Sequence, residues 1–298
     1  MILVWMLLGT LAASGVMLVV RWMIEVRRDG TRHKSAAAPS QLHLVIGFIT
    51  NFFDTLGIGS FATTTAAFRL FRLVSDELIP GTIIVGDALS VLTQAMLFIS
   101  SVDVDPWQMT TLIAVCIAGG WLGAGVVASL SRRAVQLGIG SALMVAAAFM
   151  AIGMLGWIPS GGTALVFSRP AFAVALVVNF VLGALLPLGI GNYAPSLVVF
   201  SLLGMDPRAA FPIMMGSGAF VATVAGIRFI GAHRFDRRAA LGLTIGGIPG
   251  VMAAVWLVKS LPLDALRGLV LIVVVYVSVS LLRSAAHHGA SRVAEPTG

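Results

Sequence analysis

The sequence predicts an all-α polytopic membrane protein: an N-terminal anchor helix, then two inverted repeats, each a broken, re-entrant helical hairpin followed by three transmembrane helices. Of the 298 residues, 58% are hydrophobic and 10% charged, and the mean hydropathy is +1.01, so lipid must be the solvent for most of the chain. The motif Leu-Gly-Ile-Gly occurs twice, at residues 56–59 and 188–191, inside two long apolar segments. The basic residues form short clusters between apolar segments, the pattern that encodes membrane topology.

Residues 1–41 form the predicted anchor and its linker. An apolar run over residues 1–23 has its basic residues, Arg21, Arg27 and Arg28, at its far end. A cleaved signal peptide would carry its positive charges first, so this segment is expected to be an anchor that starts outside. Residues 25–40 are polar and basic, and indicate a cytoplasmic linker.

The first repeat is expected over residues 42–157 and the second over residues 169–282. Each begins with a segment that its glycine pair should break, because glycine is a poor helix former. These broken segments are residues 42–71 and 169–203. The full spans that follow are residues 79–101, 107–130 and 135–157 in the first repeat, and 209–231, 239–258 and 263–282 in the second. Residues 158–168 link the repeats, and residues 283–298 form a polar cytoplasmic tail that is expected to be disordered.

A constant offset of 132 residues between the two halves indicates an internal duplication. This offset pairs glycine, alanine or proline with the same residue type at five positions: Gly57 with Gly189, Gly59 with Gly191, Ala62 with Ala194, Pro80 with Pro212, and Gly86 with Gly218. Residues 42–73 would span roughly 48 Å as one helix, against about 30 Å for a bilayer core, so a re-entrant hairpin is favoured over a crossing. Re-entry also gathers most basic residues on one side. Three full spans per repeat then make the second repeat inverted.

The breaks are the predicted binding site of a transporter, because matching interruptions in two halves mark such sites. A half-helix that begins after each break presents free N–H groups and a partial positive charge, which favours a small anion with several oxygens. Polar side chains follow both breaks, with the alternative that they only cap the half-helices. The candidate substrate-binding residues are Gly57, Gly59, Ser60, Thr63 and Thr64 in the first repeat and Gly189, Gly191, Asn192, Tyr193 and Ser196 in the second.

Two acidic residues lie within the predicted membrane elements: Asp54, three residues before Gly57, and Asp87, seven after Pro80. A buried carboxylate is costly to ionise and tends to be protonated, so either residue is a candidate proton-coupling group. The alternative is that one of them is simply paired with a nearby Asn or Thr. Four further polar residues are expected to make interhelical hydrogen bonds: Asn51, Gln94, Asn179 and Ser217. Small-residue runs at 118–125 and 244–250 indicate close helix packing.

With these motifs the chain resembles the TauE/SafE family of sulfite exporter-like membrane permeases, over most of residues 42–282. The resemblance rests on the duplicated glycine-rich break, on the second copy Gly-Asn-Tyr-Ala-Pro at residues 191–195, and on the small-residue runs. It implies export of sulfite, sulfoacetate or related organosulfur anions across the bacterial inner membrane. The first break is shorter than in many members, and Thr63 stands where the second copy has Pro195.

Other functions are disfavoured by the same residues. The net charge of +7 does not indicate nucleic-acid binding, because the basic clusters lie between apolar runs. No catalytic triad, Walker loop or clustered metal site is visible, so neither an enzyme nor a cofactor is expected. Two alternatives remain: a carrier of a small carboxylate or of a cation that uses Asp54 and Asp87 as ligands, and a non-transporting membrane sensor or accessory subunit. The expected partners are a small anion, protons and the lipid bilayer.

Overall fold

The structure is a computed structural model that describes residues 2–29, 38–122, 132–155, 162–185 and 192–293. Within these ranges the chain is almost entirely helical, and six helices are long and apolar enough to cross a membrane. The packing divides the chain into two compact units, Met1–Thr110 with Met215–Ser260, and Thr111–Met214 with Leu261–Gly298. Each unit therefore combines elements of both predicted repeats.

The first unit contains α1 (Ile2–Asp29), α2 (Gln41–Thr55), α3 (Ser60–Leu70), α4 (Ile79–Ser101), the second part of α10 (Pro207–Gly231) and α11 (Arg237–Ser260). The second unit contains α5 (Pro106–Leu122) from Thr111 onward, α7 (Arg132–Met154), α8 (Arg169–Leu185), α9 (Tyr193–Leu202), the start of α10, and α12 (Leu263–Val293). Wherever the structure describes them, the predicted apolar segments lie within these helices, although α12 runs well past the predicted end of its segment. The ends of two predicted elements, residues 123–130 and 158–161, lie outside the described residues.

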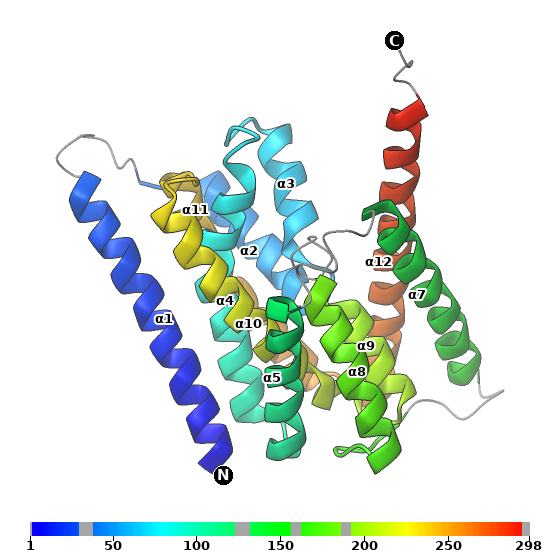
Figure 1. The fold of residues 1–298 in the computed structure, drawn as a ribbon. Coiled ribbons are helices and arrows are strands. Elements are labelled where there is room, and N and C mark those ends of the chain that lie inside the picture. The colour runs from blue at the N-terminus through cyan, green and yellow to red at the C-terminus, as the bar shows by residue number, and fades with distance from the viewer. Residues whose placement is uncertain (1, 30–37, 123–131, 156–161, 186–191, 294–298) are drawn as a thin grey trace. The chain divides into compact units, whose positions relative to one another are not determined.

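The first broken segment is a hairpin, as Figure 1 shows for α2 and α3. His43, near the start of α2, and Phe68, near the end of α3, make an edge-to-face ring contact at 6.5 Å. Phe68 and Ile46 also share one buried cluster with the start of α4 and with α11. Both open ends of the hairpin therefore lie at the same end of this unit, as re-entry requires.

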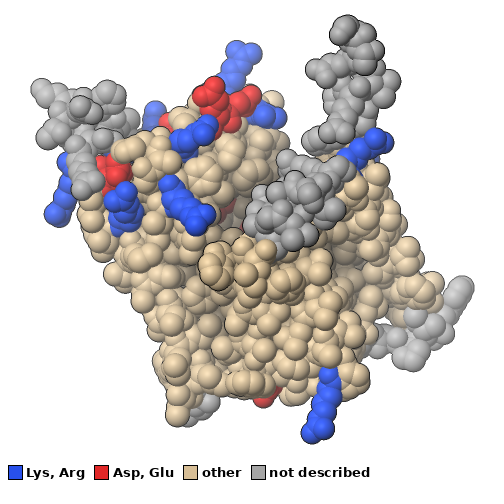
Figure 2. All heavy atoms as spheres, in the orientation of Figure 1, with Lys and Arg blue, Asp and Glu red and all other residues tan. Residues whose placement is uncertain are grey.

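Charged groups gather at this end of the first unit. Glu25 of α1 contacts His233 after α10 at 2.9 Å, Thr82 of α4 accepts the backbone N–H of Asp236, and Arg238 donates to the carbonyl of Ala38. In Figure 2, charged side chains gather over this end of the first unit. This end is the one that the positive-inside rule assigns to the cytoplasm.

A glycine-lined face of α11 packs directly against α2. A Cβ added to Gly246 would lie 2.0 Å from the carbonyl oxygen of Leu44, and one added to Gly250 would lie 2.3 Å from that of Phe48. Nothing larger than hydrogen fits between these two backbones. The small-residue run at 244–250 is therefore a packing surface, as predicted.

The second unit has a matching contact between α8 and α5. A Cβ on Gly119 of α5 would lie 2.1 Å from the carbonyl oxygen of Phe180 of α8. Phe48 and Phe180 are equivalent at the offset of 132 residues that pairs Gly57 with Gly189. The same offset pairs Gly119 with Val251, so Gly250 is one position short of the equivalent residue. The first helix of each predicted broken segment, α2 or α8, thus packs on the middle span of the other predicted repeat.

The turns that end α3 and α9 are also alike. The N–H groups of Arg72 and Leu73 donate to the carbonyls of Arg69 and Phe68, and those of Gly204 and Met205 donate to the carbonyls of Ser201 and Phe200, at equivalent positions of the two repeats. Gly204 has φ +94°, and Arg72 at the equivalent position has φ +52°. This hydrogen-bond pattern ends a helix in the left-handed region, which explains the unusual conformation of Arg72.

One predicted boundary is wrong. Residues 283–298 were expected to be disordered, but α12 continues as far as Val293. Between Arg283 and Val293 lie three alanines, Ala285, Ala286 and Ala290. Their high helix propensity, together with the helix already formed before them, favours continuation.

The hairpin geometry predicts which surfaces share a side of the membrane. In a Cys116→Ala background, cysteines at Ser75 and His233 should react with an impermeant maleimide added from the cytoplasmic side. A cysteine at Asp103, at the far end of α4, should react only from the other side. All three positions are exposed, and the wild-type Cys116 is fully buried, so it serves as the unlabelled control. Labelling of Ser75 and His233 from opposite sides would mean that the first segment crosses the membrane.

Candidate functional site

The break between α2 and α3 is made by two glycines in conformations that other residues avoid. Gly57 has φ +98° and Gly59 has φ +89°. The N–H groups of Gly57 and Ile58 turn back to the carbonyls of Asp54 and Phe53, so the end of α2 is satisfied internally. Gly59 then caps α3, which starts at Ser60. The predicted helix break is confirmed for the first repeat.

Asp54 closes this break from the side of α2. Its Oδ1 accepts the backbone N–H of Ser60 at 2.8 Å, and its Oδ2 accepts Nε2 of Gln94 in α4 at 2.9 Å. The residue is 4% exposed. One carboxylate therefore joins three elements: the last turn of α2, the first residue of α3 and the middle of α4.

Asp87 of α4 reaches the same point. Its Oδ1 accepts Nδ2 of Asn51 at 2.9 Å, and its Oδ2 accepts Oγ of Ser60 at 2.8 Å. Ser60 thus bridges the two carboxylates, through its N–H to Asp54 and its hydroxyl to Asp87. No ion pair joins either carboxylate to a basic side chain in the described part of the chain. Protons or a bound cation must balance whatever negative charge this cluster carries.

Several polar atoms around the two carboxylates have no hydrogen-bond partner among the described residues, although their side chains are fully buried. They are Oδ1 of Asn51, Oγ1 of Thr64, Oγ of Ser90 and Oε1 of Gln94. Buried groups without a hydrogen-bond partner are unusual in native structures, and a bound ligand, ion or water is one explanation for them. Thr64 lies one turn after Ser60, on the same face of α3.

Gly247 of α11 makes room beside this cluster. A Cβ at this position would lie 2.3 Å from Oγ of Ser90 and 2.7 Å from Nδ2 of Asn51. Ser90 and Gly247 were not among the predicted site residues. Their contribution depends on the packing of α11 against α2 and α4, which no spacing along the chain reveals.

The second break is described only on its far side. Gly189 and Gly191 lie outside the described residues. Asn192 and Ser196 are buried, and neither Nδ2 of Asn192 nor Oγ of Ser196 has a hydrogen-bond partner among the described residues. Tyr193, the first residue of α9, is half-buried. The predicted site residues Asn192, Tyr193 and Ser196 thus lie at the start of α9. Those from the first repeat that follow its break, Ser60, Thr63 and Thr64, lie in α3.

The remaining predicted residues have more ordinary surroundings. Thr63 is half-buried, and its hydroxyl donates to the carbonyl of Ser60 at 2.9 Å, so its hydrogen bond serves its own helix. Asn179 donates to the carbonyl of Leu112 at 2.7 Å, which confirms the predicted interhelical bond. Asn51 and Gln94 also bond between helices as predicted, but their acceptors are the two carboxylates.

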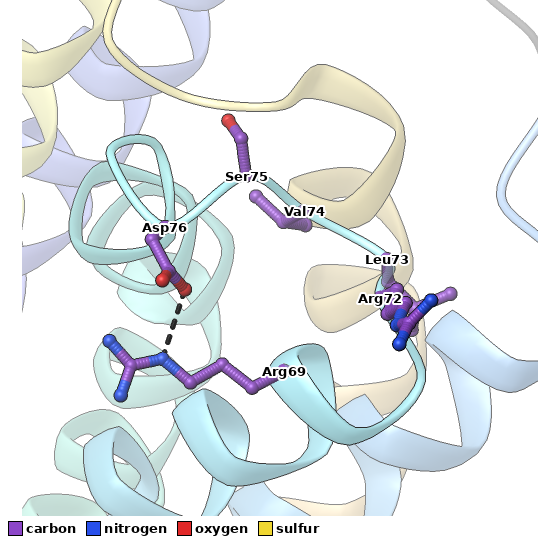
Figure 3. A pocket seen from close by; sticks show the side chains of 6 residues that line it. All are labelled: Arg69, Arg72, Leu73, Val74, Ser75 and Asp76. Carbon is purple, nitrogen blue, oxygen red and sulfur yellow. Dashed lines mark hydrogen bonds and ion pairs between the residues drawn. The ribbon is translucent and has the colours of Figure 1, made fainter.

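A surface pocket of about 550 Å³ lies at the open end of the first hairpin (Figure 3). It is lined by Arg69, Arg72, Leu73, Val74, Ser75 and Asp76. Nε of Arg69 pairs with Oδ1 of Asp76 at 2.9 Å, and both side chains are more than half exposed. Such an exposed pair contributes little to stability, and the pocket belongs to the charged surface, apart from the buried cluster.

Substitution of Gly59 tests the break. No atom lies within 4 Å of a Cβ at Gly59, so Gly59→Val should act through its positive φ alone, at a cost of about 1–3 kcal/mol in folding free energy. Relaxation of this strain would move Ser60 away from Asp54, so transport of a small oxyanion into proteoliposomes should be lost while membrane insertion persists. Gly9→Val is the matched control, because Gly9 in α1 also has no neighbour within 4 Å and no positive φ. Equal activity of the two variants would remove the reason for placing the site at this break.

Comparison with known proteins agrees with this architecture. Residues 171–297 match the family model described as sulfite exporter TauE/SafE. No curated protein and no solved structure matches the chain. The match covers nearly all of α8, then α9 and the three helices after it, the part of the chain that carries Asn192 and Ser196. The second half of this polytopic helical chain is therefore similar to the TauE/SafE family of sulfite exporters.

Proposed function

We propose that this chain is a proton-coupled secondary transporter that exports a small oxyanion, such as sulfite or an organosulfonate, across the bacterial inner membrane. The observation that carries the proposal is the buried break of the first hairpin, where the N-terminus of α3 meets two carboxylates that no basic side chain among the described residues neutralises. The match of residues 171–297 to the TauE/SafE family model supports the class of transporter. The substrate, the coupling ion and the membrane are the proposed parts.

The donors that follow the breaks support an anionic substrate. Ser60 presents a backbone N–H and a hydroxyl, while Asn192 and Ser196 present an amide and a hydroxyl that have no partner among the described residues. Buried donors of this kind gain most from an acceptor that offers several oxygens. Sulfite and sulfonates each offer three.

The carboxylates support proton coupling. Asp54 and Asp87 are each 4% exposed, and together they supply four acceptor oxygens within one hydrogen-bonded cluster. Two adjacent buried carboxylates cannot both stay ionised cheaply, so at least one proton is expected to be bound. The proton that leaves or enters with the substrate is assigned to Asp54, because it contacts the break directly.

We further infer that the two halves are inverted repeats that exchange access between the two sides of the membrane. The equivalent contacts of Phe48 with Gly250 and of Phe180 with Gly119 support the duplication, as do the alike turns at Arg72 and Gly204.

A cation carrier is the second candidate function. The observation that favours it is the set of buried oxygens without hydrogen-bond partners near Asp54 and Asp87, on Asn51, Ser90 and Gln94. Carboxylate, amide and hydroxyl oxygens are the ligands that hard cations prefer.

Flux measured in proteoliposomes separates these functions. We expect the purified chain to move sulfite or a sulfonate, and to do so faster under a pH gradient than without one. Carboxylates and mono- and divalent cations complete the panel. Vesicles without protein and vesicles with Gly59→Val are the controls. Cation flux without any oxyanion flux would replace the proposal by the cation carrier, and the absence of all flux would favour a non-transporting role.

Asp54→Asn tests the coupling. The amide keeps the shape of the side chain and can still accept the N–H of Ser60, but it cannot release a proton. We expect the variant to exchange labelled substrate across the membrane, but not to concentrate it when a pH gradient is applied. Asp87→Asn should have a milder effect, because Asp87 contacts the break only through the hydroxyl of Ser60. Concentration of substrate by Asp54→Asn at the wild-type level would return Asp54 to a structural role.

A further inference from the structure

We propose that the carboxylate of Asp54 occupies the place of the transported oxyanion at the N-terminus of α3, so that anion binding requires Asp54 to accept one proton. The inference rests on the proposed function and specifies how anion and proton are linked at a single position. It makes Asp54 an internal competitor of the substrate as well as a proton carrier.

The geometry of the break supports this role. Oδ1 of Asp54 lies 2.8 Å from the N–H of Ser60, the first residue of an 11-residue helix. That position carries the positive end of the α3 dipole, where an anion binds favourably. Asp54 itself belongs to the last turn of α2, where a negative charge opposes the helix dipole. The start of α3, and not its own helix, therefore stabilises the ionised form of this carboxylate.

The second hairpin shows the same position without an internal acid. Asn192 and Ser196 are the equivalents of Ser60 and Thr64 in the second repeat, and all four side chains are buried. Nδ2 of Asn192 and Oγ of Ser196 lack a hydrogen-bond partner among the described residues. The position equivalent to Asp54 is Leu186, whose side chain cannot accept a hydrogen bond. Ser60 thus has carboxylate acceptors, Asp54 for its N–H and Asp87 for its hydroxyl, whereas Nδ2 of Asn192 has no partner among the described residues.

Within α3, donors in neighbouring turns also differ in whether they have a hydrogen-bond partner. The N–H of Ser60 is satisfied by Asp54, whereas the fully buried hydroxyl of Thr64, one turn later on the same face of α3, has no partner among the described residues. An oxyanion larger than a carboxylate would reach both. This unpartnered hydroxyl is the observation that points to a ligand other than Asp54 at this helix end.

The charge of Asp54 then decides whether Asp54 or an oxyanion accepts the N–H of Ser60. An ionised Asp54 and an oxyanion at the same helix end would repel each other strongly in a buried site. Protonation removes this repulsion, frees the N–H of Ser60 and adds an O–H donor. Where Asp54 of the free protein is ionised, one proton passes from solvent to Asp54 for each anion bound. The affinity should therefore be constant at low pH and fall by about tenfold per pH unit above the pH at which Asp54 of the free protein loses its proton.

Binding of ethanesulfonate and of sulfite to the purified full chain, measured by calorimetry over a range of pH, tests this linkage. Ethanesulfonate keeps a single charge over this range, so any change in its affinity comes from the protein. The wild type should lose affinity as pH rises, whereas Asp54→Asn should bind with nearly constant affinity and more tightly than the wild type at high pH. Asp76→Asn, an exposed acid at the surface pocket, is the control and should keep the wild-type slope.

Gln94→Leu provides a second variant in case Asp54→Asn does not fold. Nε2 of Gln94 donates to Oδ2 of Asp54 and so stabilises its ionised form. Its loss should move the fall in affinity to higher pH without changing the slope. Equal slopes in Asp54→Asn and the wild type, or a pH-independent wild-type affinity for ethanesulfonate, would overturn the inference and leave the transporter proposal intact. If the protein neither bound nor transported any anion, both the inference and the transporter proposal would be overturned.

Discussion

The hydrogen bond from the N–H of Ser60 to Asp54 is the interaction on which the first hairpin depends. A helix that stops within a membrane leaves backbone groups that lipid cannot satisfy. Gly57 and Gly59 let the chain turn back on itself, and Asp54 then closes the start of α3. Because a carboxylate in this position must itself be satisfied, Gln94 of α4 supplies its second donor. The helix break, Asp54 and the polar face of α4 therefore depend on one another.

Much of this architecture could be predicted from the sequence, because glycine pairs and apolar length act locally. The ends of α2, α3 and α4 follow from the positions of Gly57, Gly59 and Pro80. The meeting of Asp54 and Asp87 at Ser60 could not be predicted, since it depends on the distance between α2 and α4. The left-handed Arg72 was equally hidden, because only its equivalence to Gly204 in the folded turn identifies it.

The two halves use the same contacts for different chemistry. At one level of the α2–α11 interface, Asn51 faces Gly247, and at the equivalent level of the α8–α5 interface Gly183 faces Cys116. In the first case the larger side chain is on the hairpin and reaches Asp87. In the second it is on the span, where it fills space without a strong polar group. The small residue therefore lies on α11 in the first case and on α8 in the second, and the two helices pack closely in both.

The pairing of α2 with α11 has a consequence for how the protein is made. α2 ends at Thr55, and its partner begins at Arg237, so the ribosome has completed more than half of the chain before the two can meet. Until then the polar face of α2 that carries Asn51 lacks the glycine surface that covers it in the folded protein. The first hairpin must therefore wait, at the translocon or at the edge of the bilayer, for a helix from the other half. Neither half contains all the surfaces that its own hairpin needs, and assembly has to be a late, joint event.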